Sequence, residues 1–143
     1  EITIVFPKDT LTLSVNAGTA RVGFSTIKRE NPQQAPMFCM LLRKHLIPSR
    51  LVSVTQPGFE RIIRLDFEAL SELGDKVIKH LVIELMGRHS NIILTDESGR
   101  ILDAIKHIDI YHLHAFIGNM HYAQPVGESV SIDFHRATAL CSL

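Results

Sequence analysis

Short runs of apolar and β-branched residues, separated by polar turns, mark the start of the chain. Three such runs occupy residues 2–6, 11–15 and 20–25, and the connections between them carry Pro, Asp, Asn and Gly. Short apolar runs bounded by turn-forming residues are typical of β-strands. The pattern therefore predicts a three-stranded meander.

The next apolar residues recur at helical spacing. They are Met37, Phe38, Leu41 and Leu42. Pro36 suits the first turn of a helix, and Pro48 cannot continue one. We therefore expect a helix from Pro36 to about residue 46, with these four residues as its buried stripe. Its last turn is basic, which the helix dipole alone favours by about 0.3–1 kcal/mol per cation.

Strand-like runs dominate the rest of the chain. Residues 50–55 and 59–67 flank Gln56-Pro57-Gly58, which suits a type II turn. Further runs follow at residues 77–86, 91–94, 101–108 and, less distinctly, 111–115. About eight short strands and one clear helix predict an α+β domain with two packed, mostly antiparallel β-sheets and one main helix.

Two charges stand against this apolar pattern. If residues 59–67 form a strand, Arg61 lies on its apolar face. Glu84 likewise lies on the apolar face of the run 77–86. An unpaired buried charge costs several kcal/mol, so both side chains need partners. One interpretation is a structural salt bridge that includes Arg61 and Glu84 or another acid. The other is that Arg61 has a binding role. We expect Glu84 to be buried and hydrogen-bonded.

The segment 87–91, Gly-Arg-His-Ser-Asn, concentrates polar groups between two strand-like runs. Binding residues are often mounted where a strand ends. Arg88 and His89, aided by Ser90 and Asn91, have the chemistry to receive a phosphate group. A rigid turn, in which Ser90 or Asn91 binds backbone N–H groups, explains the same residues without a ligand. Both interpretations stay open from the sequence.

Composition narrows the class of protein. The 143 residues suffice for one domain with a core. With 45% hydrophobic and 21% charged residues they indicate a globular chain, and no apolar run is long enough to span a membrane. The formal net charge of zero excludes a uniformly basic nucleic-acid binder but leaves room for a local basic patch. We interpret Cys39 and Cys141 as reduced thiols rather than a disulfide.

No catalytic or metal site is expected. The histidines that invite a metal interpretation are His107, His112, His114 and His121. Their spacing fits no familiar zinc site and no cysteine stands nearby, so surface histidines are the favoured interpretation. No glycine-rich phosphate loop and no serine nucleophile motif is present. We therefore expect no cofactor and no enzymatic activity.

Two long segments resemble one known family. They are ELMGRHSNIIL at 84–94 and PMFCMLLRKHL at 36–46, supported by GFERI at 58–62 and ILDAIKH at 101–107. Together they resemble the N-terminal domain of the NFACT family, whose bacterial members are called fibronectin-binding protein A or RqcH. On this resemblance, residues 1–125 form an NFACT-N-like domain truncated at its N-terminus, and residues 126–143 begin a following segment.

The resemblance implies both fold and function. The expected fold resembles the N-terminal domain of formamidopyrimidine-DNA glycosylases, without the catalytic pair of those enzymes. The implied protein is a cytoplasmic ribosome-associated quality-control factor, which binds the stalled large ribosomal subunit and positions alanyl-tRNA for C-terminal alanine tailing. The alternative is a surface adhesin that binds fibronectin. A third interpretation, an enzyme acting on nucleic acid, lacks a catalytic constellation.

The resemblance also singles out residues. The family carries an Asp-Arg pair, implicated in handling tRNA, where this chain has Glu60-Arg61, so the acid is one methylene longer. The residues expected to bind tRNA or rRNA are Arg61, Glu60, Arg88, His89, Arg43 and Lys44. Arg64, Lys106 and His107 would extend a basic surface if they shared a face with these residues.

Overall fold

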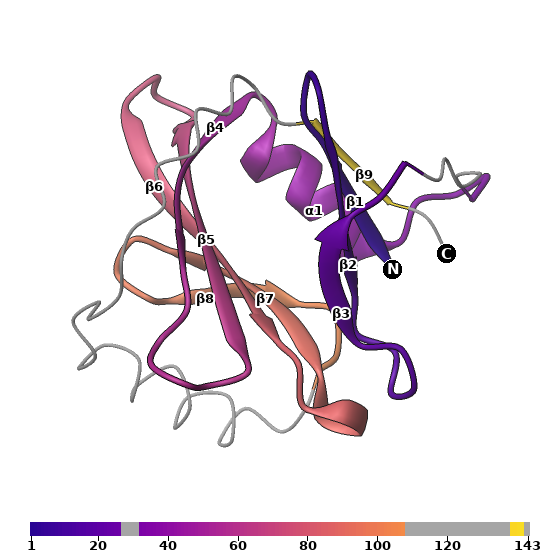
Figure 1. The fold of residues 1–143 in the computed structure, drawn as a ribbon. Coiled ribbons are helices and arrows are strands. Elements are labelled where there is room, and N and C mark those ends of the chain that lie inside the picture. The colour runs from indigo at the N-terminus through magenta and orange to yellow at the C-terminus, as the bar shows by residue number, and fades with distance from the viewer. Residues whose placement is uncertain (27–31, 108–137, 142–143) are drawn as a thin grey trace.

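The computed structural model describes residues 1–26, 32–107 and 138–141. Within these ranges the chain forms two antiparallel β-sheets and one α-helix, with the helix near one end of the space between the sheets (Figure 1). This arrangement confirms the α+β class with two packed sheets. Among the described residues, no helix has the length and apolar character that a membrane span requires.

The first sheet contains the predicted meander. Its strands are β1 (Ile2–Val5), β2 (Thr10–Ser14), β3 (Arg21–Phe24) and β9 (Thr138–Cys141), in the order β3-β2-β1-β9. Every neighbouring pair is antiparallel. The segment 138–141, which the sequence analysis assigned to a following segment, thus adds a fourth strand to the sheet that begins the chain.

The second sheet follows chain order. Its strands are β4 (Ser49–Thr55), β5 (Ile62–Leu70), β6 (Lys76–Glu84), β7 (Asn91–Asp96) and β8 (Ile101–Ala104). The β5–β6 pair is in register over its whole length, from Ile62 opposite Glu84 to Leu70 opposite Lys76. All five strands lie near their predicted places, but β5 begins three residues later than expected and continues to Leu70.

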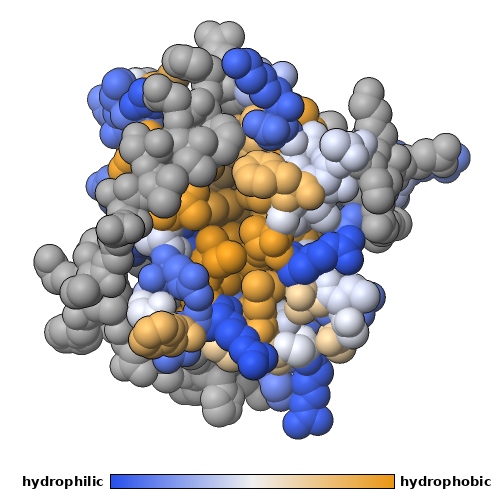
Figure 2. All heavy atoms as spheres, viewed as in Figure 1, coloured by the Kyte–Doolittle hydropathy of each residue, from blue (hydrophilic) through white to orange (hydrophobic). Residues whose placement is uncertain are grey.

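The core lies between the sheets and under the helix α1 (Met37–Leu46). Alternate residues of β5, including Leu65 and Phe67, point into this core. The buried residues of α1 are Phe38, Cys39, Leu42 and Leu46. The predicted stripe is therefore wrong at Met37, which is 77% exposed. The helix instead buries the face that carries Phe38, Leu42 and Leu46, which are spaced four residues apart. In Figure 2 apolar residues gather in the middle of this view, over the region between the sheets.

Candidate functional site

The connection between β4 and β5 differs from the sequence prediction. A backbone hydrogen bond from Glu60 N to Pro57 O (3.1 Å) closes a turn in which Gly58 has a positive φ of 51°. Gly58 is thus the first central residue, so the predicted type II turn with Pro57 in that place is wrong. The turn takes up residues that would otherwise begin the strand. Phe59 and Arg61 are exposed in the connection instead of lying on the apolar face of β5.

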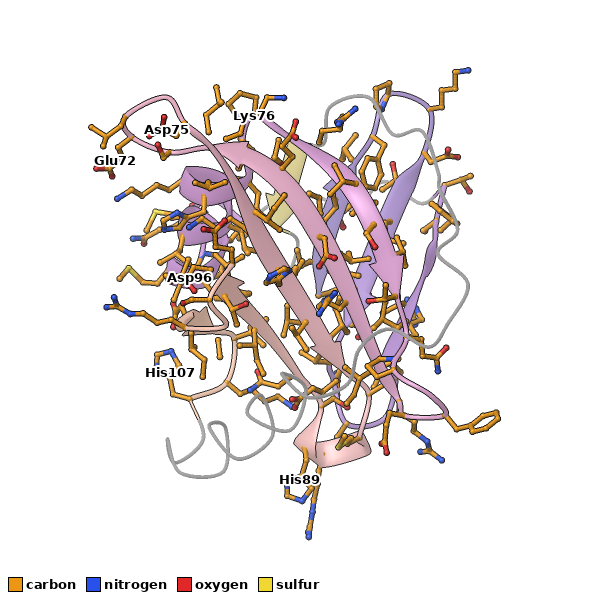
Figure 3. All side chains as sticks on the ribbon, turned by 90° about the vertical axis from the view of Figure 1, so that its left-hand side faces the viewer. Glu72, Asp75, Lys76, His89, Asp96 and His107 are labelled. Carbon is orange, nitrogen blue, oxygen red and sulfur yellow. The ribbon has the colours of Figure 1, made fainter. Side chains whose placement is uncertain are left out.

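Arg61 lies at the end of the second sheet that also carries the segment 87–91. Its carbonyl oxygen accepts a hydrogen bond from Leu85 N (2.8 Å), just beyond the end of β6. The 3-10 helix η1 (Gly87–His89) follows two residues later. Figure 3 shows His89 at this end of the sheet, opposite the turn that carries Glu72. The structure therefore brings Arg61, Arg88 and His89 to one end of the molecule.

The side chains of Arg88 and His89 are exposed and touch each other. Gly87 has a positive φ of 58°, and Ser90 N donates to Gly87 O (3.1 Å), which closes the short helix. Arg88 Nε donates to His89 Nε2 (2.9 Å), so this ring nitrogen is the acceptor of the bond. The remaining guanidinium donors of Arg88 have no partner in the described part of the chain and can bind an anion.

Ser90 and Asn91 are fully buried and cannot reach a phosphate group from solvent. Asn91 Oδ1 accepts from Lys106 N and Ile92 N (both 3.0 Å), and Asn91 Nδ2 donates to Lys106 O (3.0 Å). Lys106 Nζ in turn donates to Val15 O (3.0 Å) and to Arg88 O (3.3 Å). For Asn91 the rigid-turn interpretation is therefore the correct one. Asn91 and Lys106 fix η1 against both sheets.

Replacing Asn91 by alanine should destabilise the fold. The change leaves the backbone N–H and C=O groups of Lys106 without their hydrogen-bond partner and removes the bond to Ile92 N. Each unsatisfied buried group costs about 1–3 kcal/mol, so we expect a loss of at least about 2 kcal/mol in the free energy of unfolding. Urea unfolding of the variant and the parent measures this loss. An unchanged midpoint of urea unfolding would contradict this structural role of Asn91.

Glu84 is buried as expected, at 7% exposure, but the predicted hydrogen bond is not found among the residues that the structure describes. Its Oε1 atom is shielded from solvent and has no partner among the described residues. Burial raises the pKa of Glu84 from 4.5 to about 7. The interpretation that pairs Glu84 with Arg61 in a structural salt bridge is therefore wrong, because the late start of β5 leaves Arg61 exposed outside the strand. Near neutral pH the carboxyl group is partly protonated, which reduces the negative charge at this end of the sheet.

Arg43 and Lys44 lie at the opposite end. Lys44 Nζ pairs with Glu72 Oε1 (3.3 Å) in the β5–β6 turn, whereas Arg61 immediately precedes β5. Nine residues of strand span about 30 Å. The pKa of His45 is lowered, first by partial burial and then by the positive charges of Lys79 and Lys44. These two lysines give this end of the sheet a positive environment of its own. The structure thus separates the predicted basic residues into two groups, and an RNA-binding role for Arg43 and Lys44 stays a prediction.

The other predicted basic residues have structural partners. Arg64 Nη2 donates to Asp66 Oδ2 (3.3 Å), and the same carboxylate lies 2.7 Å from His80 Nδ1. His107 Nε2 lies 2.8 Å from Asp103 Oδ1. Within the described ranges no three metal-binding side chains come together. The predictions for residues 111–115, which include His112 and His114, and for His121 fall outside the described residues.

The arrangement suits an anion with several oxygens. Arg61 and Arg88 present planar guanidinium groups on a sheet end that Asn91 and Lys106 hold rigid. Guanidinium groups bind phosphate oxygens in a fork, and most protein contacts to nucleic acids reach phosphate and sugar. The side chain of Arg61 makes no hydrogen bond or ion pair to the described part of the chain. Sequence reasoning missed the full exposure of Phe59 beside it, although Gly58 is a signal of a turn there.

Known proteins are similar to this chain in sequence and in fold. Residues 2–114 match the family model described as NFACT N-terminal and middle domains. The protein "Rqc2 homolog RqcH" of Bacillus subtilis is 42% identical over 99 residues, which cover 68% of this chain and 17% of that protein. "Ribosome quality control complex subunit NEMF" of Homo sapiens is 42% identical over 69 residues, which cover 48% of this chain and 6% of that protein.

Solved structures share the fold. The N-terminal domain of fibronectin-binding protein PavA from Streptococcus pneumoniae has a TM-score of 0.68 and 37% identity, over 71% of this chain and 39% of that one. The N-terminal part of the fibronectin/fibrinogen-binding protein of Streptococcus suis has a TM-score of 0.68 and 29% identity, over 87% and 44%. The chain spans less than a fifth of the curated relatives it matches. By the extent of its match to the family model, this chain belongs to the NFACT family.

Proposed function

We propose that the sheet end formed by Arg61, Arg88 and His89 binds RNA through phosphate contacts. The observation that carries the proposal is the hydrogen bond from Leu85 N to Arg61 O, because it brings two separate, exposed basic segments together. Among the described residues, neither guanidinium group forms an ion pair with an acid. Glu60, the exposed acid next to Arg61 in sequence, is not paired with it, and Glu84 is buried with a raised pKa. Arg61 also matches the arginine of the family's Asp-Arg pair.

In this proposal the chain is a binding module of a cytoplasmic ribosome quality-control factor. The relatives named RqcH and NEMF support such a role. The whole protein binds the stalled large ribosomal subunit and positions tRNA, with alanyl-tRNA as the substrate of tailing. The ribosome performs peptide transfer, so the chain itself is not an enzyme. The glycosylase-like fold expected from the sequence brings no catalytic pair with it.

Salt-dependent binding to large ribosomal subunits tests this function. The protein should co-sediment with the subunits, and the logarithm of its affinity should fall by about 0.7–0.9 per neutralised phosphate for each tenfold rise in salt. Plate binding to purified fibronectin, run in parallel, measures the adhesin alternative suggested by the names of two structural neighbours. Salt-resistant fibronectin binding without subunit binding would contradict the proposal.

A further inference from the structure

The turn before β5 carries a fully exposed aromatic ring. Phe59 is the second central residue of the turn between Pro57 and Glu60, and its side chain is fully exposed to solvent. The turn is ordered by the Glu60 N to Pro57 O bond (3.1 Å) and by Gln56 Nε2, which donates to Glu60 O (2.8 Å). The ring is therefore presented from a fixed backbone, which lowers the entropy lost when a partner binds it.

The surroundings of Phe59 define the partner. Arg61 follows two residues later, and the backbone bond to Leu85 links this turn to the end of β6, from which η1 projects Arg88. An aromatic ring beside guanidinium groups is the combination that binds single-stranded nucleic acid. The cations neutralise phosphates, and the ring stacks on a base that no complementary strand covers.

We propose that Phe59 is a positioning residue that stacks on an unpaired RNA base, so that this sheet end prefers single-stranded RNA to duplex RNA. The inference rests on the proposed function, because the phosphate contacts of Arg61 and Arg88 bring the strand to the ring. A duplex offers the same phosphates but keeps its bases stacked inside the helix. The preference for single strands therefore depends on Phe59 and not on the arginines.

The test compares two substitutions of Phe59 with one control. Phe59→Leu keeps an apolar side chain but removes the aromatic face, and Phe59→Tyr keeps the ring. Leu73→Ala serves as the control, since Leu73 is 91% exposed in the β5–β6 turn, at the other end of the sheet. The probes are a short single-stranded RNA that carries 2-aminopurine and the duplex of the same sequence. Binding is measured by anisotropy, and stacking by the fluorescence change of the modified base.

Phe59→Leu should weaken single-strand binding by about 5- to 100-fold, abolish the fluorescence change and leave duplex binding unchanged. Phe59→Tyr and Leu73→Ala should behave like the parent. If Phe59→Leu binds single strands normally while Arg61→Ala does not, the stacking proposal is overturned and the proposed function stands. If the parent protein binds no RNA, the stacking proposal and the proposed function are both overturned. If Phe59→Leu keeps RNA binding but loses co-sedimentation with large subunits, Phe59 contacts protein and stacking is overturned.

Discussion

Replacing Arg61 by alanine in the whole protein is expected to abolish alanine tailing of stalled chains while leaving the fold intact. The side chain is exposed and makes no hydrogen bond or ion pair to the described residues, so its removal strands no buried group. Its backbone bond to Leu85 N does not depend on the side chain. A charge-assisted contact to phosphate contributes about 1.5–3 kcal/mol, so RNA affinity should fall about 10- to 100-fold. Tail synthesis, RNA affinity and a melting curve are the three measurements.

Arg100→Ala is the matched control for this experiment. Arg100 is an exposed arginine in the β7–β8 turn, at the end of the sheet away from η1. The Arg100→Ala substitution should lower neither alanine tailing nor RNA affinity. A lowered melting temperature for Arg61→Ala would mean that Arg61 has a structural partner after all. Normal tailing by a folded Arg61→Ala protein would show that this residue does not serve the function.

Replacing Glu84 by glutamine should remove a large pH dependence of stability. The folded state holds the proton of Glu84 up to about pH 7, whereas an unfolded chain releases it near pH 4.5. Between these values the folded state binds more protons, so the free energy of unfolding falls as pH rises through this window. The difference between these two pKa values corresponds to about 3 kcal/mol of folding stability, which is lost in full above about pH 7.

The measurement is urea unfolding of Glu84→Gln and the parent at several pH values. The stability of the glutamine variant relative to the parent should rise by about 3 kcal/mol between about pH 4 and pH 8. Glutamine has nearly the shape of the protonated acid, so packing is preserved. A difference between the two proteins that stays constant over this range would show that Glu84 is ionised in the folded state and has a partner.

The fold was predictable where local patterns decide it. The meander follows from short apolar runs between turn residues, and α1 follows from helical spacing between Pro36 and Pro48. Spacing alone could not decide which side of α1 is buried. The sequence supports a stripe through Met37, but packing against the sheets selects the one through Phe38 and Leu42. The start of β5 was missed because Phe59 and Arg61 continue its alternation, while the Gly58 turn removes them from the strand.

The site was predictable only in part, because its geometry is not local. Burial of Glu84 followed from its apolar neighbours, but its lack of a partner depends on where Arg61 lies in three dimensions. The functions of Ser90 and Asn91 looked equivalent in the sequence. Burial and the contacts of Asn91 to Lys106 show that this asparagine supports the loop. The separation of Lys44 from Arg61 follows from sheet topology, which no single motif contains.

The central claim is that one end of the second sheet, and not the general charge of the chain, binds RNA. The most direct test compares the salt dependence of RNA binding for two double variants with the same loss of charge. Arg61→Ala with Arg88→Ala removes the two exposed arginines of this end. Lys8→Ala with Arg100→Ala removes exposed cations from turns that lie away from it. The slope of log affinity against log salt should become shallower by about 1.4–1.8 in the first variant and stay at the parent value in the second. Equal slopes in the two variants would contradict the claim.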